Sequence, residues 1–136
     1  MSHYLGFKFA HILIAIVGLG SGAAAAVVAE PRLVRRLMYT CVIPGYVLML
    51  ISGMWMGDLA NLLDARWTEA AMNLWGVGAL LLAGVLLALH RQIKLADNDR
   101  RVSVDYRRAV WLGRLSAGAA ALVILVIIHF MVFKPA

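Results

Sequence analysis

The stretch FAHILIAIVGLGSGAAAAVVA, residues 9–29, runs for 21 positions without an Asp, Glu, Lys or Arg. A helix rises about 1.5 Å per residue, so about 20 apolar residues are enough to cross the hydrocarbon core of a bilayer. Three further runs of the same kind occupy residues 37–57, 70–89 and 115–133. The four runs predict an all-α integral membrane protein with four spanning helices.

The overall composition also indicates a membrane protein. Of 136 residues, 63% are hydrophobic and 15% are charged, and the mean hydropathy is +0.85. A chain this short has too small an interior to bury so much apolar surface, so lipid must cover the rest. This excludes a soluble enzyme domain, a nucleic-acid-binding module and a disordered chain. We expect a single domain over residues 1–136, a four-helix bundle with spans at about 4–29, 37–57, 69–90 and 109–133.

The net charge of +6 is distributed unevenly among the loops. The loops after the first and third runs carry an excess of Arg and Lys, whereas the loop after the second run is acidic. Loops rich in Arg and Lys stay on the cytoplasmic side of a membrane. The pattern therefore predicts a multi-pass protein of the bacterial inner membrane with both termini on the periplasmic side. The lipid bilayer is its first partner, and the basic loops are expected to contact anionic headgroups.

Local signals predict how the helices bend and end. Pro44 has no backbone N–H to offer the carbonyl of Thr40, so we expect a bend there, repaired by the Thr40 hydroxyl. Residues 58–67 place leucines and a tryptophan at helical spacing, which predicts a short helix lying in the membrane interface. The charged loop at residues 91–108 is expected to extend the two adjoining helices beyond the lipid.

Small residues mark a packing face on the first helix. Gly18 and Gly22 have the GxxxG spacing, which lets a second membrane helix approach closely. We therefore predict helix packing at these glycines. A homo-oligomer or a larger membrane complex is the expected assembly.

Histidines inside the spans are the main candidates for chemistry, because ionisable groups at membrane depth are costly. His11 and His129 are predicted to lie at comparable depths near the periplasmic side, each on a face turned toward the bundle. Two such imidazoles can supply opposite axial ligands to a haem iron, or two ligands to a copper or zinc ion. Alternatively, each forms only a structural hydrogen bond. His90, at the cytoplasmic end of the third run, is a weaker candidate.

Methionines near the two histidines open a second chemical interpretation. Five lie in the predicted outer half, among them Met54 and Met131. Thioethers together with imidazoles suit Cu(I), so copper handling is an alternative to haem binding. Methionine also fills gaps in apolar packing, and these residues have no regular MxxM spacing.

The beginning and end of the chain carry a family resemblance. FKFAHIL at residues 7–13, followed by GLG at 18–20, resembles the opening of a group of small bacterial membrane proteins. The group includes CopD-type copper-resistance proteins, HemJ-type protoporphyrinogen oxidases and uncharacterised DUF-class predicted integral membrane proteins. The ending MVFKP, residues 131–135, is most similar to the uncharacterised members.

The resemblance implies that His11 corresponds to the first-helix histidine that ligates haem in the HemJ-type proteins. Those proteins also have an essential lysine in the third helix, whereas residues 70–89 contain none. The likeness therefore implies association with haem or a metal without choosing a reaction.

These observations predict a small membrane protein that binds haem b through His11 and His129 in the outer half of the bundle. Its expected role is electron transfer to or from a quinone or a larger membrane complex. The alternatives are a non-catalytic packing subunit and a copper-handling protein. No nucleophile and base are paired along the sequence, so the isolated chain is expected to be at most an oxidoreductase component.

Overall fold

The computed structural model describes residues 2–28, 30–61, 63–64, 66–98 and 101–133, which are helical apart from short turns. The elements, in chain order, are α1 (Ser2–Val27), α2 (Pro31–Leu37), the π-helical turn η1 (Met38–Val42), α3 (Ile43–Leu59), α4 (Arg66–Asp97) and α5 (Val104–Phe133). Because α2, η1 and α3 are continuous, the described residues form four helices long and apolar enough to cross a membrane. The all-α fold with four membrane-compatible helices is thereby confirmed.

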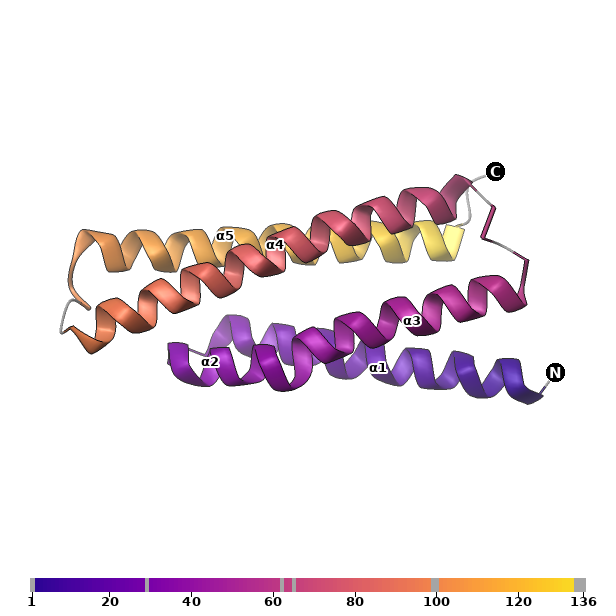
Figure 1. Ribbon diagram of the computed structural model, residues 1–136, viewed down its shortest axis with the longest axis horizontal. Coiled ribbons are helices and arrows are strands. Elements are labelled where there is room, and N and C mark those ends of the chain that lie inside the picture. Colours follow the sequence, from indigo (N-terminus) through magenta and orange to yellow (C-terminus); the bar gives the residue numbers. More distant parts are fainter. Residues whose placement is uncertain (1, 29, 62, 65, 99–100, 134–136) are drawn as a thin grey trace.

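The helices form two antiparallel hairpins (Figure 1). Helices α4 and α5 make the most extensive contact, and α1 packs along η1 and α3. The N- and C-termini lie at the same end of the molecule, which we call the terminal end (Figure 1). The opposite end, where α2 begins and α4 ends, is called the loop end; here α2 packs against α4 and joins the hairpins.

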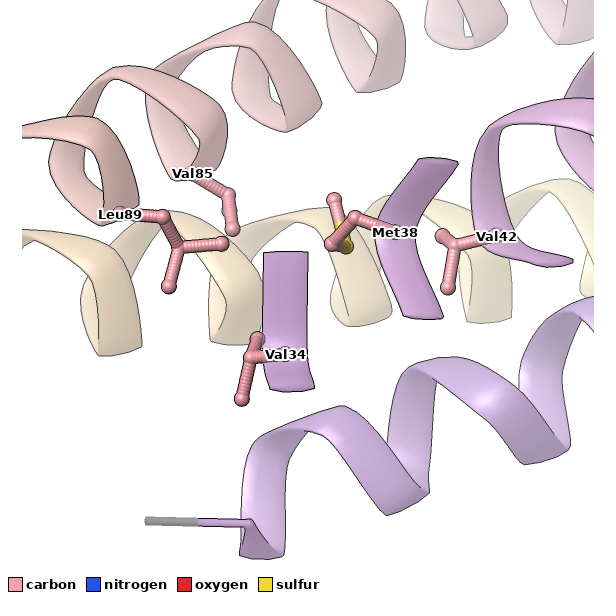
Figure 2. Packing of buried hydrophobic residues seen from close by; sticks show 5 residues of the cluster. All are labelled: Val34, Met38, Val42, Val85 and Leu89. Carbon is pink, nitrogen blue, oxygen red and sulfur yellow. The ribbon is translucent and has the colours of Figure 1, made fainter. Parts of the chain in front are cut away.

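The buried core lies toward the loop end. Val34, Met38 and Val42, from α2 and η1, meet Val85 and Leu89 of α4 (Figure 2). Each is at most 8% exposed. An exposed ion pair between Arg32 and Asp97 links α2 and α4 at the same end. Apolar contact at one end therefore fixes how the two hairpins meet.

The sequence predicted a bend at Pro44. In the structure, a π-helical turn accommodates the proline. In η1 the N–H of Ile43 bonds to the carbonyl of Met38, five residues earlier. Such a turn inserts an extra residue and commonly adjusts a helix next to a disruption. The Thr40 hydroxyl donates to the Arg36 carbonyl at 2.9 Å, so it satisfies a backbone group within the same turn.

The connection at residues 58–67 differs from the predicted interfacial helix. Helix α3 ends at Leu59, and α4 already begins at Arg66. The described residues between them form turns, with Asn61 in the left-handed region at a φ of 51°. Asparagine tolerates this conformation better than most residues, and it ends the helical path that the apolar spacing had suggested. The charged connection between α4 and α5 follows the prediction, since both helices extend into residues 91–108.

A buried amide fastens α4 to α5. The Gln92 side chain is 8% exposed, and its Nε2 donates to the Ala109 carbonyl at 3.1 Å. A Cβ added at Gly113 would lie 3.2 Å from that Nε2, so the glycine leaves room for the amide. Helix α5 thus provides the Ala109 carbonyl that accepts this hydrogen bond and, at Gly113, the space for the Gln92 amide.

Replacing Gln92 with Met keeps the length of the side chain and removes the donor. We expect the free energy of unfolding to fall by about 1 kcal/mol, the usual size of an interhelical hydrogen bond in a membrane protein. Unfolding in SDS, followed by tryptophan fluorescence, measures this change. An equally stable Gln92→Met variant would show that the bond adds nothing to packing of α4 on α5.

Candidate functional site

His11 lies on the face of α1 that packs against α3. Its side chain is half-buried, and its Nδ1 lies 2.7 Å from the Ser52 Oγ. A Cβ added at Gly53 would lie 3.5 Å from the Cε1 atom of the same ring. Adjacent residues of α3 therefore hold the imidazole: Ser52 through a hydrogen bond and Gly53 through the space it leaves.

The Ser52 hydroxyl lies within hydrogen-bond distance of both His11 and its own helix. Its Oγ is 2.7 Å from the Leu48 carbonyl and 3.2 Å from the Met49 carbonyl, a common arrangement for serine in a helix. When the single hydroxyl hydrogen is donated to a carbonyl, the Ser52 oxygen accepts from Nδ1–H of His11. In this tautomer the neutral imidazole has its lone pair on Nε2. This is the arrangement of many metal-binding histidines, whose second nitrogen donates to a protein oxygen.

The His11 contact belongs to a regular antiparallel interface. The ring centroids of Phe7 and Trp55 are 4.9 Å apart, toward the terminal end. Seven residues beyond His11, Gly18 meets Gly45, where an added Cβ would lie 3.1 Å from the Gly18 Cα. A Cβ added at Gly22 would meet nothing within 4 Å. The backbones of α1 and α3 thus cross closely at Gly18. Of the two glycines predicted to pack against another helix, Gly18 makes this contact and Gly22 does not.

His129 occupies an exposed position on α5, close to the terminal end. The principal neighbour of α5 is α4, whereas α1 packs chiefly on α3. The contacts described for His11 are with Ser52 and Gly53 of α3. Both histidines nevertheless belong to the same end of the bundle.

The weaker candidates are dispersed. His90 lies at the loop end of α4, where it lines a groove with Arg35. Met54 is 44% exposed on α3, and the side chain of Met131 lies outside the described residues. Within the part of the chain that the structure describes, His, Cys, Asp and Glu residues form no cluster of three suited to a metal ion.

A second interhelical contact involves residues that the sequence did not single out. Tyr46 of α3 stacks on Trp75 of α4 with ring centroids 4.7 Å apart and planes inclined by 18°. The Tyr46 hydroxyl donates to the Trp75 carbonyl at 2.6 Å. The indole Nε1 of Trp75 is buried without a hydrogen-bond partner in the described structure. Unpaired buried donors of this kind are rare in proteins, and this N–H could donate to the oxygen of a ligand.

Gly78 makes the Tyr46–Trp75 contact possible, because any Cβ there would overlap the Tyr46 hydroxyl. In Gly78→Val we expect both the hydrogen bond and the stack to be lost, reducing the free energy of unfolding by about 2 kcal/mol. The matched control is Gly76→Val, since a Cβ at Gly76 meets nothing within 4 Å. Unfolding in SDS followed by tryptophan fluorescence compares the two. Equal stability of the two variants would contradict this role of Gly78.

An apolar groove of about 280 Å³ runs between α1 and the helix formed by η1 and α3. Leu13 and Val17 line it from α1, and Pro44 and Leu48 line it from the other helix. Thr40 and Cys41 add a polar edge. Leu13 lies two residues after His11 on α1, whereas His11 itself is not among the residues that line the groove.

Comparison with protein-family models, with curated proteins and with solved structures finds no match. The resemblance of the chain ends to the CopD-type, HemJ-type and uncharacterised families therefore stays a prediction.

Proposed function

We propose that this protein is a small haem-binding membrane protein, with His11 as the axial ligand of a b-type haem and electron transfer as its role. The observation that carries the proposal is the hydrogen bond between His11 Nδ1 and the Ser52 Oγ. It leaves the Nε2 lone pair as the donor atom for iron, and it fixes the orientation of the ring. Bound haem supplies one-electron exchange between ferric and ferrous iron.

The residues around His11 fit this group in their chemistry. A neutral imidazole can ligate iron, and the α1 residues that follow His11, such as Leu13 and Val17, line an apolar groove whose surface suits a porphyrin ring. Lys8 lies three residues before His11, adjacent on the same helix and exposed, so its ammonium is available to a propionate. His129 is the proposed second ligand, because it belongs to the same end of the bundle.

We further propose that the electron partner is a quinone. The buried Nε1 of Trp75 offers a hydrogen bond to a quinone carbonyl, which would supply the acceptor that this atom lacks within the described chain. The proposed location is the bacterial inner membrane with both termini periplasmic. The basic residues at the loop end support this orientation, since α2 carries Arg35 and Arg36 in its last turn.

An accessory subunit of a larger membrane complex is the second candidate function. Gly20 and Gly22 on α1 and Gly118 on α5 leave space in which an added Cβ would meet nothing within 4 Å. Glycines at helix surfaces allow another membrane helix to approach closely. In this alternative His11 serves only to join α1 to α3.

The absorption spectrum of the protein purified in detergent, before and after addition of haemin, separates the candidates. A Soret band with about one haem per chain supports haem binding. Bound copper without this band would overturn the proposal in favour of copper handling. A protein that stays colourless and metal-free after haemin is added would overturn it in favour of the accessory role.

A further inference from the structure

The loop end contains a groove that the His11 site does not use. It has a volume of about 500 Å³ and lies between α2 and α4. Its lining consists of Arg35, His90, Ile93, Lys94, Asp97 and Asn98. Ile93 is buried, whereas the polar residues around it are exposed. The groove therefore combines an apolar floor with a polar rim.

The charges of this rim favour an anion. Asp97 is the one carboxylate in the lining, and it is already paired with Arg32. Arg35 and Lys94 have no carboxylate partner among the ion pairs of the described residues. Two cations from different helices thus face the same groove, and the imidazole of His90 and the amide of Asn98 add hydrogen-bonding groups.

The position of the groove along the helices matches the level of lipid phosphates. It lies where α2 begins and α4 ends, beside the apolar core formed by Val34 and Leu89. The charged ends of spanning helices lie at the membrane surface, and basic pockets between such helices bind anionic headgroups. Arginine also suits phosphate recognition, because its planar guanidinium donates two parallel hydrogen bonds.

We propose that the groove between α2 and α4 binds a phosphate group through Arg35 and Lys94, as found in the headgroup of an anionic phospholipid. His90 and Asn98 donate further hydrogen bonds to the same group. The apolar floor at Ile93 accommodates the glycerol and the first methylenes of the chains. The bound lipid then links the two hairpins at the end where they already meet. This proposal does not depend on haem binding at His11.

The test is native mass spectrometry of the full chain in detergent with phosphatidylglycerol or phosphatidylcholine added. We expect phosphatidylglycerol to bind more tightly, because it carries a net negative charge. In the double variant Arg35→Gln, Lys94→Gln its affinity should fall by about fivefold for each cation removed. The matched control is Arg107→Gln, Arg108→Gln, which removes two exposed cations from α5 at the same end of the molecule. The control should retain the preference for phosphatidylglycerol.

Inorganic phosphate distinguishes the two sources of the ligand. If excess phosphate leaves phosphatidylglycerol bound, the groove is a lipid site. If phosphate displaces the lipid from the wild type and not from the double variant, the groove holds the free anion. Equal losses in the two double variants, or equal binding of the two lipids, would overturn the proposal. Circular dichroism and the unfolding midpoint in SDS verify that the variants fold.

Discussion

The His11→Ala variant is expected to lose the Soret band completely, whereas His90→Ala should retain it. Removing the imidazole removes the Nε2 lone pair that we assign to the iron. His90 is the matched control because it is a histidine of the same chain that lies at the loop end. The measurement is the absorbance of purified protein after haemin is added in equal amounts and unbound haemin is removed by gel filtration, because free haemin also absorbs in the Soret region. A His11→Ala protein that binds haem with an unchanged spectrum would contradict the assignment.

The Ser52→Ala variant tests whether His11 ligates haem or only packs α1 against α3. Ser52→Ala leaves the His11 ring in place but removes the hydroxyl that is hydrogen-bonded to its Nδ1. Loss of such a partner usually reduces metal affinity by about 10-fold to 100-fold. We therefore expect Ser52→Ala to bind haem more weakly, with the band present at high haemin concentration. If His11 only joins the helices, Ser52→Ala lowers stability and no variant has a Soret band.

The His129→Ala variant tests whether His129 is the second haem ligand, as we propose. If it is the second ligand, His129→Ala keeps haem and changes the iron from six-coordinate low-spin to five-coordinate high-spin, which the position of the Soret band reveals. A spectrum unaffected by His129→Ala would leave His11 as the single histidine ligand. We expect His11→Ala to lose more bound haem than His129→Ala, because Ser52 already orients the His11 imidazole.

The four long helices could be predicted from the sequence because each contains a nearly uncharged run long enough to cross a membrane. Apolar length is a local property, and the helices extend outward from these runs into the charged loops. The position of His11 within the first helix was evident for the same reason. The turn after Leu59 was predicted wrongly, because apolar spacing in residues 58–67 continued a helical pattern that Asn61 interrupts.

Helix pairing could not be predicted, because it depends on contacts between residues far apart in sequence. Ser52 is 41 residues from His11, and a single serine in an apolar run gives no indication of its partner. The π-helical turn before Pro44 is likewise one of several ways to accommodate a proline. Ser52 lies seven residues beyond Gly45 on its helix, and His11 lies seven residues before Gly18. This equal spacing from the two glycines was the signal that could have linked Ser52 to His11.

The hairpin of α1 and α3 is expected to be disrupted by Gly45→Val and to tolerate Gly22→Val. A Cβ at Gly45 would lie 3.1 Å from the Gly18 Cα and 3.6 Å from the Gly18 nitrogen. These are backbone atoms, which cannot rotate aside as a side chain can, so the two helices must separate. Overpacking of this kind costs about 3 kcal/mol. Gly22→Val is the matched control, since it adds the same side chain to α1 where the space is open.

The consequence of Gly45→Val should extend to His11. Gly45 and Ser52 are seven residues apart on α3, as are Gly18 and His11 on α1, so about two helical turns separate the crossing from the hydrogen bond. Separation at the crossing lengthens the contact between Nδ1 and Oγ. We therefore expect Gly45→Val to unfold at lower SDS and to bind haem less tightly, although every proposed ligand is retained. If Gly45→Val and Gly22→Val match the wild type in both measurements, the close crossing of α1 and α3 does not position His11.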